Sequence, residues 1–580
     1  MDIFEQIKFD IEFVASKLIK DKNEWKSYIV EFPKNPLNGD IYTNIALVIK
    51  SKTNKSISEI AFFFKQELEK YDYIAHIEIA GRGFINFTIK AFKWQEYLNY
   101  ILEDKENFWA PNIGNQAKVN IEYVSANPTG PLHIGHTRCA IYGDILSNIF
   151  KIAGYVVTKE YYINDAGSQI DKLIETVFLR CKEILTSQTI QIKNDMYPGE
   201  YIKEIAHELI KIYQNKLLVS EEKDLRNKVK NFTIAYVMSI IKKDLALLNI
   251  KHDVFTSEKH LQDNGIIDKA IALAEKKNCF YYGIIDLPKG KSSKDLIQKE
   301  QMLFKSSQFG DAQDRPIKKQ DGSWTYLASD FAYAKDKIDR GFDILIYVLG
   351  ADHKGYIERI KAVVKVLSQN KVKSVVKTNE LVNFVTNDKN FKMSKRSGNI
   401  ITIKDVLDKV GLNALRFMMV SRKNDLEMDF DFTKVVAQSK DNPIFYIQYA
   451  YVRILSIMKR AKKQCPEALK LFYNKEFDLS LLSNEEEIQI IKLLATWPKL
   501  IVSILKSFEP HRIANYTLEI ASKFHSLWNM GKLGQSKNNY LFIITDNPKL
   551  TASRLAFAES IRKVILKSFE LIGIQALEEM

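Results

Sequence analysis

The stretch from Ile121 to Asp144, IEYVSANPTGPLHIGHTRCAIYGD, constrains the fold of this chain more than any other. Its apolar, β-branched start predicts a buried strand at 119–124, and the residues up to Pro131 form a turn-rich connection. A helical pattern follows and ends near Gly154. A strand, a turn and a helix N-terminus in this order favour phosphate binding, because the first N–H groups of a helix lack partners within it and its dipole is positive there.

Two histidines, His133 and His136, stand at the start of this predicted helix. Because they are three residues apart, their imidazoles fall on one face of the first turn. Gly135 between them has no side chain, which leaves room for a flat adenine or its ribose against the backbone. The alternative interpretation is a plain connection with two surface histidines, since an HxGH pattern is short.

The composition excludes several classes of protein. A chain of 580 residues is too long for one hydrophobic core, so we expect roughly two to four domains. With 46% hydrophobic and 27% charged residues it is globular in composition. Its net charge of +14 suits a polyanionic partner, although a lysine-rich surface kept for solubility would give the same value.

The four cysteines lie far apart and form no CxxC pair, which argues against a zinc knuckle and against a disulfide framework. We therefore expect no protein-bound zinc. The N-terminus carries charges throughout and lacks the apolar core of a signal peptide. No stretch approaches the ~18–20 apolar residues of a membrane span. These features predict a soluble cytoplasmic protein that does not contact membranes.

The chain divides into three regions of different character. Residues 1–105 predict a small α+β domain, with a hairpin at 77–87 whose glycines mark the bend. Residues 106–435 alternate strand and helix patterns, as in an α/β domain with a parallel sheet. Within them, a lysine-rich helical stretch at about 185–320 is interpreted as an insertion between two halves of the sheet. Residues 436–580 are helical throughout and predict a bundle.

A second βα pattern brings further polar residues to the same edge of the sheet. Residues 343–349, DILIYVL, form a continuous apolar run, typical of a strand buried on both faces of a parallel sheet. Tyr326 and Asp330 precede this run and His353 follows it. Because ligands collect at the carboxyl ends of such strands, we expect these side chains near His133, although more than 190 residues intervene.

The sequence FKMSKRSGN at 391–399 places Lys392 and Lys395 on a Ser- and Gly-rich loop. From such a loop the two ammonium groups can reach a polyphosphate from the side opposite the helix. Taken by itself, this sequence in a lysine-rich chain is more typical of a solvated loop. Its place after the HxGH pattern and after the last parallel strand favours phosphate binding instead.

These two stretches resemble the HIGH motif and the KMSKS loop of class I aminoacyl-tRNA synthetases, with Arg396 in place of the final serine of the loop. The HIGH-type stretch consists of Ala126, Asn127, Pro128, Thr129, Gly130, Pro131, Leu132, His133, Ile134, Gly135 and His136. The surrounding residues are most similar to bacterial arginyl-tRNA synthetases. The sequences GDIYTN, GRGFINF, YYINDAGSQID and NPIFYIQYAYVR also resemble that family, so the resemblance covers nearly the whole chain and is weakest at 185–320.

The resemblance implies a fold and a reaction. The fold is an α/β catalytic domain with a Rossmann-like, doubly wound parallel sheet, a small N-terminal α+β domain that touches the tRNA elbow, and an all-α C-terminal bundle that binds the anticodon. The reaction activates L-arginine with ATP, accompanied by Mg²⁺, to arginyl-adenylate, and then transfers the arginyl group to the terminal adenosine of tRNA(Arg). The family resemblance also implies a monomer.

Site residues follow from the resemblance position by position. The catalytic set would be His133, His136, Lys392 and Lys395. The ATP-binding set would be Thr129, Gly130, His133, Gly135, His136, Met393 and Lys395. The arginine-binding set would be Glu122, Ser125, Asn127, Tyr326, Asp330 and His353. In this scheme Tyr326 and Asp330 would contact the guanidinium. The alternative interpretation is that Asp330 is an ordinary acidic residue near the start of a helix.

Three other functions fit the sequence less well. A cysteinyl-tRNA synthetase would need zinc-binding cysteines that this chain lacks. A nucleotidyltransferase with an HxGH motif that makes a small adenylylated cofactor would not need the helical C-terminal third. A catalytically inactive tRNA-binding relative would not be expected to keep both the histidines and the lysines.

Overall fold

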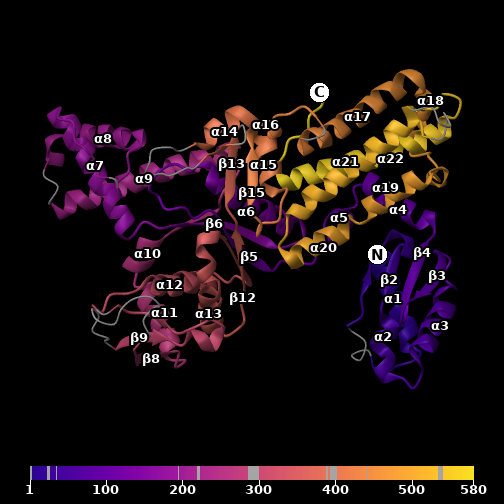
Figure 1. Cartoon of the computed structure of the whole chain (residues 1–580), viewed down its shortest axis with the longest axis horizontal. Helices are drawn as coiled ribbons and strands as arrows, with labels where there is room; N and C mark the ends of the chain where they lie inside the picture. Colours follow the sequence, from indigo (N-terminus) through magenta and orange to yellow (C-terminus); the bar gives the residue numbers. More distant parts are fainter. Residues whose placement is uncertain are drawn as a thin grey trace.

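The computed structural model of the chain describes residues 3–21, 27–33, 35–193, 195–218, 222–284, 300–319, 321–386, 389–391, 401–439, 442–532 and 540–580. Figure 1 shows an elongated molecule. Helices α7 (Ser168–Thr186) and α8 (Glu200–Tyr213) lie at one end, and the N-terminal sheet lies at the other end beside the C-terminal helices. Among the described residues no single helix is long and apolar enough to cross a membrane, although one bent pair, Glu485–Ala495 with Trp497–Ser507, reaches that length and composition together.

The central element is a parallel sheet of five strands in the order β12-β11-β5-β6-β7. Its strands are β5 (Lys118–Glu122), β6 (Val156–Ile163), β7 (Val254–Ser257), β11 (Ile344–Gly350) and β12 (Lys373–Asn379). The chain runs outward from β5 in one direction through β6 and β7, and later in the other direction through β11 and β12. The topological switch point therefore lies between β5 and β11, where such sheets bind their ligands.

Helices cover both faces of this sheet, as the doubly wound prediction requires. Alternate residues of β11 enter different cores: Ile346 and Val348 pack with residues of α6 (Ile134–Ile152), whereas Leu345 and Tyr347 pack with α12 and α13. The helices on that second face are α12 (Tyr326–Asp339) and α13 (Ile357–Ser368), preceded by the short helix η6 (Ala351–Tyr356). The apolar run of β11 is thus buried on both faces, as predicted.

The stretch interpreted as one insertion, 185–320, contains a strand of the main sheet. On one side of β7 lie the helices α8, η4 (Gln214–Leu218) and α9 (Lys223–Leu247), which continue from α7. On the other side lies a small unit with an antiparallel sheet of order β10-β9-β8. Its elements are α10 (Glu258–Asp263), α11 (Ile266–Glu275), β8 (Phe280–Gly283), β9 (Gln301–Phe304), η5 (Ser306–Phe309) and β10 (Arg315–Pro316). Along the chain, strand β7 therefore separates two inserted units, one before it and one after it.

A third small sheet, of order β14-β13-β15, follows the last parallel strand. It contains β13 (Val382–Thr386), β14 (Lys389–Phe391) and β15 (Met428–Asp431), and the helices beside it are α14 (Ile403–Val410), α15 (Leu412–Val420) and α16 (Phe432–Val435). The loop with Lys392, Met393 and Lys395 lies outside the described residues.

The N-terminal region is an antiparallel sheet of order β1-β2-β4-β3 covered by helices. Its elements are α1 (Ile3–Ser16), β1 (Val30–Glu31), η2 (Pro36–Asn38), β2 (Ile41–Thr43), α2 (Ile45–Ile49), η3 (Lys50–Lys52), α3 (Ile57–Leu68), β3 (Ile74–Ala80) and β4 (Phe84–Ile89). The predicted hairpin is present, and Gly81 and Gly83 at its bend both have positive φ.

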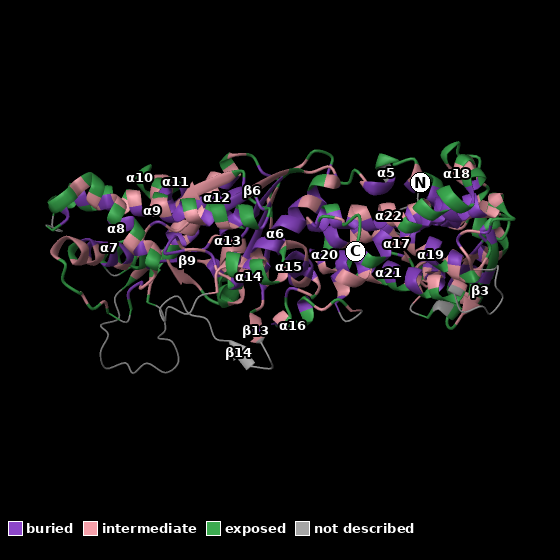
Figure 2. Cartoon of the chain, turned by 90° about the horizontal axis from the view of Figure 1, so that it is seen from above, coloured by how far each residue is buried: buried purple, intermediate pink, exposed green. Residues whose placement is uncertain are grey.

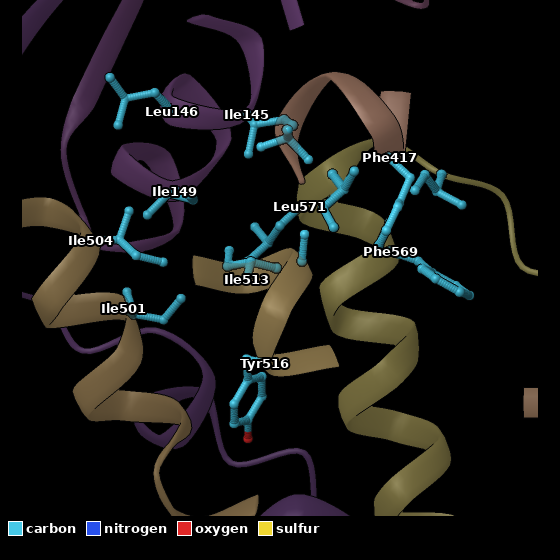
Figure 3. Packing of buried hydrophobic residues seen from close by; sticks show 14 of the residues in the cluster. Ile145, Leu146, Ile149, Phe417, Ile501, Ile504, Ile513, Tyr516, Phe569 and Leu571 are labelled. Carbon is cyan, nitrogen blue, oxygen red and sulfur yellow. The ribbon is translucent and has the colours of Figure 1, made fainter. Parts of the chain in front are cut away.

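The C-terminal region is a helical bundle, as predicted. It consists of α17 (Pro443–Gln464), α18 (Pro466–Tyr473), η7 (Leu479–Leu481), α19 (Glu485–Ala495), α20 (Trp497–Ser507), α21 (His511–Lys532) and α22 (Pro548–Ile572). Figure 2 shows buried residues running along the inner sides of α6, α17, α21 and α22. In Figure 3, α6 itself reaches this core, where Ile145 and Ile149 lie close to Ile504 of α20 and Ile513 of α21. The helix that opens with the two histidines is thus buried between the sheet and the bundle.

Helix α4 (Ala91–Leu102) and the short α5 (Glu106–Trp109) also pack against this bundle. Trp94 on α4 is fully buried, and the side-chain amide of Gln95 donates to the carbonyl of Leu482 at 2.9 Å. The sequence placed α4 in the N-terminal domain. In space it belongs to the surface of α19 and α22, so the compact N-terminal unit ends near β4.

Candidate active site

Between β5 and α6 the backbone is held in an unusual conformation. Val124 and Ser125 have φ values of 71° and 40°, in the left-handed region that non-glycine residues rarely adopt. Such strain persists where surrounding contacts hold it, and it concentrates at functional sites. Here the contacts are visible: the Ser125 hydroxyl donates to Glu122 at 3.1 Å and accepts the N–H of Tyr162 at 3.0 Å.

His133 is the N-cap of α6, and the two histidines cap the helix reciprocally. Nδ1 of His133 accepts the N–H of Gly135 at 3.1 Å, and Nδ1 of His136 accepts the N–H of His133 at 3.2 Å. The two rings lie 3.9 Å apart between centroids. Because Nδ1 accepts in both rings, the neutral tautomer carries its proton on Nε2, which makes Nε2 the donor to a ligand.

A glycine is required at position 135 because the imidazole of His133 packs against its backbone. A Cβ atom at this position would lie 2.9 Å from the imidazole of His133. The sequence argument assigned the glycine to a close approach of adenine or ribose. The structure shows that the first group to need this space is the capping histidine.

One large cavity, of about 900 Å³, opens at the switch point of the sheet. Its lining contains both histidines, Gly135 and every residue of the predicted arginine-binding set, namely Glu122, Ser125, Asn127, Tyr326, Asp330 and His353. These side chains come from β5, the turn before α6, α12 and η6, so the parallel sheet gathers residues that are more than 190 positions apart in sequence. The expectation that they share one rim is met by the geometry.

Most of the remaining residues of the HIGH-type stretch lie outside the cavity. Ala126 lines the cavity, but Thr129 and Gly130 do not, although they were predicted to bind ATP. Both are buried under the phenol of Tyr201, whose hydroxyl donates to the carbonyl of Thr129 at 2.5 Å. The apolar members of the stretch are mostly buried: Pro128, Leu132 and Ile134, with Pro131 half-buried.

Glu122 does not offer a free charge to this cavity. One carboxylate oxygen accepts from Lys337 at 2.7 Å, and the other accepts the Ser125 hydroxyl. The Lys337 ammonium is itself fully buried, with the rings of Tyr333 and Tyr347 at 4.0 and 4.1 Å from Nζ. This buried pair neutralises Glu122 and fixes the strained turn through Ser125.

Asp330 and Glu258 place two carboxyl groups at the other side of the cavity. Burial raises the pKa of Asp330 to about 7, with Glu258 and Glu122 adding to the effect and Arg359 opposing it. Burial also raises the pKa of Glu258 above its ordinary value, against a hydrogen bond from Ser329. In the described part of the chain, neither carboxylate forms an ion pair with a lysine or an arginine within 4.0 Å. Two carboxyl groups without a basic partner favour a cationic ligand, because a bound cation would stabilise their ionised forms.

Aromatic and polar groups complete the lining. Tyr162 and Tyr333 stack with centroids 4.2 Å apart beside the two carboxylates, which suits a planar cation. Tyr326, at the first position of α12, is 69% exposed. His353 is half-exposed, with Nε2 3.4 Å from a carboxylate oxygen of Asp352. The Asn127 amide donates to Gln169 at 2.9 Å, so it is already oriented across the mouth of the cavity.

Comparison with known proteins shows the same three-part arrangement. The model of the tRNA synthetases class I (R) catalytic domain matches residues 97–440, the arginyl tRNA synthetase N-terminal domain matches 5–89, and the DALR anticodon-binding domain matches 447–580. The arginine–tRNA ligase of Rickettsia prowazekii is 51% identical over 580 residues, which is the full length of both chains. The chain belongs to the arginine–tRNA ligase family.

Solved structures agree on the fold. An arginyl-tRNA synthetase structure from Plasmodium falciparum superimposes with a TM-score of 0.73 at 16% identity, covering 100% of this chain and 99% of that one. The Thermus thermophilus arginyl-tRNA synthetase gives a TM-score of 0.70 at 18% identity, with 100% of both chains covered. As a member of the arginine–tRNA ligase family, the chain is an enzyme, a class I aminoacyl-tRNA synthetase, and ATP is a substrate of that class.

Sequence reasoning missed several residues that line the cavity of this ligase, and Lys337, which pairs with the lining residue Glu122. Glu258 directly follows β7, at the carboxyl end of the edge strand, and would have been found if that strand had been recognised. Lys337 lies two turns after Asp330 on α12, where its spacing gives no sign that it meets Glu122. Three tyrosines of the lining have sequence contexts typical of ordinary core aromatic residues, and only the fold brings them together: Tyr162, Tyr333 and Tyr347.

Proposed function

We infer that the cavity between β5 and β11 is where the ligase binds ATP beside L-arginine and joins them as arginyl-adenylate. One observation carries this assignment: the imidazoles of His133 and His136 and the unneutralised carboxylate of Asp330 line the same cavity. The histidines supply donors for phosphate oxygens, and the carboxylate supplies a partner for a cation. A site for adenylation of arginine needs both within one enclosure.

The histidine side of the cavity would hold the ATP phosphates. Attack of the arginine carboxylate on the α-phosphate spreads negative charge over oxygens, and preorganised donors stabilise that charge. Because Nδ1 accepts a backbone N–H in each ring, the neutral imidazoles carry their protons on Nε2, and these N–H groups would donate to phosphate oxygens. ATP would enter as its Mg²⁺ complex, so the metal arrives with the substrate.

Lys392 and Lys395 are proposed to neutralise the departing pyrophosphate, with Met393 beside the nucleotide. Both lysines and Met393 lie outside the described residues, but Ile401 and Thr402, where the description resumes, form backbone contacts with Ile134 and His133. Ile134 donates its N–H to the carbonyl of Ile401 at 3.4 Å, and His133 forms a β-bridge with Thr402. The loop that carries the lysines thus ends beside the start of α6.

The carboxylate side would hold arginine. Asp330, with Glu258 and the stacked tyrosines, suits the planar guanidinium, and Tyr326 would close over it. Ser125, Asn127 and His353 would orient the α-amino and carboxylate groups. Glu122 would act indirectly, because its charge is taken up by Lys337 and its second oxygen holds Ser125.

The third substrate is proposed to be tRNA(Arg), held by the N-terminal sheet and the helical bundle, which lie side by side at one end of the elongated molecule. The N-terminal sheet would touch the tRNA elbow and the helical bundle would bind the anticodon, in line with the two family models matched there. The net charge of +14 would assist binding of this polyanion. We propose that the enzyme acts in the cytoplasm as a monomer.

Arginine-dependent ATP–pyrophosphate exchange, measured with and without tRNA, tests the assignment. His136→Ala should lower the exchange kcat by about a hundredfold or more, because it removes a donor to developing charge. Lys395→Ala should lower kcat and kcat/KM together, since its contact is expected mainly in the transition state. Exchange that does not depend on arginine, or an unchanged rate in His136→Ala, would contradict the proposal.

A further inference from the structure

The turn that precedes α6 is held from outside the cavity by two side chains of the inserted helices. Tyr201 of α8 donates its hydroxyl to the carbonyl of Thr129 at 2.5 Å. Asp244 of α9 accepts the N–H of Leu132 at 2.8 Å. Neither side chain lines the cavity, so neither is placed to touch ATP or arginine.

Both contacts satisfy buried backbone groups that lie outside helices and strands: the carbonyl of Thr129 and the N–H of Leu132. Thr129 is 3% exposed and Leu132 is fully buried, so an unpaired carbonyl or N–H there would be costly. The bond to Leu132 is charge-assisted, because its acceptor is a carboxylate. The two bonds therefore fix the path of the chain immediately before His133.

Packing reinforces the first of these contacts. Gly130 has a φ of 156°, and a Cβ atom there would lie 2.9 Å from the hydroxyl of Tyr201. The phenol thus lies directly on the backbone of the turn. This close approach explains why Gly130 is needed although it does not line the cavity.

The end of α9 is also linked to α6 through Arg416 of α15. The carbonyl of Leu248, just after α9, accepts from the Arg416 guanidinium at 2.7 Å, and the same guanidinium pairs with Asp144 of α6 at 2.5 Å. Asp244 and Leu248 are one helical turn apart. The end of α9 therefore bonds directly to the turn before α6 and is linked through Arg416 to the middle of α6.

We propose that Tyr201 and Asp244 are positioning residues for adenylate formation, which gives the inserted helices a part in catalysis. They set the place of Leu132, and through it the place of the capping pair His133 and His136. This inference rests on the proposed role of those histidines in binding the ATP phosphates. A small displacement of such groups is costly, because misplacement by about 1 Å can lower a rate about a hundredfold.

Matched variants on the same two helices test the inference. Tyr201→Phe removes only a hydroxyl, and its control is Tyr236→Phe on α9, whose hydroxyl bonds the exposed Glu204 at 3.1 Å. Asp244→Ala removes the acceptor of Leu132, and its control is Asp224→Ala, an exposed ion-pair residue near the start of α9. Asp244→Asn keeps an acceptor oxygen and should recover part of the loss.

The readouts are exchange kinetics, arginine KM and thermal stability of the full chain. Tyr201→Phe and Asp244→Ala should lower the exchange kcat at least about tenfold, with arginine KM within about twofold of the parent. The two controls should match the parent. Variants that lose only stability, or that exchange at the rate of their controls, would overturn the inference.

His136→Ala, measured beside them, separates the two hypotheses. If it lowers exchange while Tyr201→Phe and Asp244→Ala do not, the positioning role fails and the proposed site stands. If His136→Ala leaves exchange unchanged, the proposed site itself fails, and the positioning role falls with it. If the variants of Tyr201 and Asp244 lower kcat together with His136→Ala, both are supported.

Discussion

The carboxylate of Asp330 occupies an unfavourable place until a cation binds. Its native pKa of about 7 lies above the ordinary value of 3.8, so the folded enzyme binds this proton more tightly than the unfolded chain does. Between pH 3.8 and about 7, Asp330 is ionised in the unfolded chain but protonated in the folded enzyme. The free energy of unfolding therefore falls as pH rises through this range. A bound guanidinium would remove that cost.

Replacing Asp330 by asparagine tests this role in arginine binding. Asp330→Asn keeps the shape but removes the charge and turns N–H donors toward the guanidinium. Losing the partner of a buried cation typically costs about 2–5 kcal/mol. We therefore expect the arginine KM to rise at least about tenfold, or ~1.4 kcal/mol, with little change in the ATP KM. Binding of citrulline, which is neutral, should differ less between variant and parent, and an unchanged arginine KM would return Asp330 to an ordinary helix acid.

The pH dependence of arginine binding gives a second test at the same residue. Because arginine favours ionised Asp330, its Kd should fall by about a factor of ten per pH unit as pH rises toward 7, and should level off above it. Calorimetry near pH 7 in buffers of different ionisation enthalpy should detect proton release on binding. Asp330→Asn should flatten the profile. A Kd that is independent of pH between about 5.5 and 8 in the parent would contradict the argument.

At this scale the sequence predicted some residues and could not predict others. His133, His136 and Asp330 stand at recognisable places, beside a helix start or before a buried strand. Glu258 and Lys337 have no such signature, because their importance arises only when β7 joins the sheet and α12 packs on β5.

Among the elements, α6 is the one whose placement decides the site. Its N-terminus presents the two histidines, its middle bears Asp144, and its far side enters the bundle core. It packs on β5 so closely that Gly143 lies against the ring of Tyr123, where a Cβ atom would be 2.3 Å from Cγ. The distance between helix and sheet is therefore set by a glycine.

Gly143→Ala should push α6 away from β5. Overpacking of this kind typically costs about 1–3 kcal/mol, so we expect a lower Tm together with a lower exchange rate. The control is Gly355→Ala, compared for stability only, because a Cβ atom there would meet nothing within 4 Å. Equal thermal stability of the two variants would show that α6 adapts without cost.

Two elements escaped sequence reasoning for identifiable reasons. Strand β7 has four residues, VFTS, which are too few and too polar for a periodic signal. Helix α4 has a clear amphipathic pattern, but such a pattern shows only that a helix needs an apolar partner. It does not reveal that the partners are α19 and α22, which begin more than 380 residues further along the chain.

At the scale of the whole molecule, the N-terminal sheet and α4 contact the bundle through different kinds of interaction. The sheet region makes polar contacts with the bundle: Asp40 pairs with Lys492 of α19, and Lys499 of α20 donates to the carbonyl of Val30 at 3.3 Å. Helix α4 instead buries the apolar side chains of Trp94 and Leu98. The sheet region can therefore be removed with less loss than α4.

Two truncations separate these roles. Removing residues 1–89 leaves α4 in place, so the product should fold, keep arginine-dependent exchange and have a Tm near that of the full chain. Removing residues 1–105 strips α4 from α19 and α22 and exposes apolar surface, at about 25 cal/mol per Å², so it should melt lower or aggregate. Circular dichroism and thermal melts decide this comparison, and equal stability of both products would contradict the assignment of α4 to the bundle.

The shorter truncation also tests the tRNA role of the N-terminal sheet, because it leaves the catalytic cavity and the bundle intact. Loss of phosphate contacts should raise the tRNA KM and make its dependence on salt less steep, since fewer counterions are released on binding. The arginine and ATP KM values should stay unchanged, because none of the described residues before 90 lines the cavity. A folded product whose tRNA KM equals that of the full chain at every salt concentration would show that the elbow contact lies elsewhere.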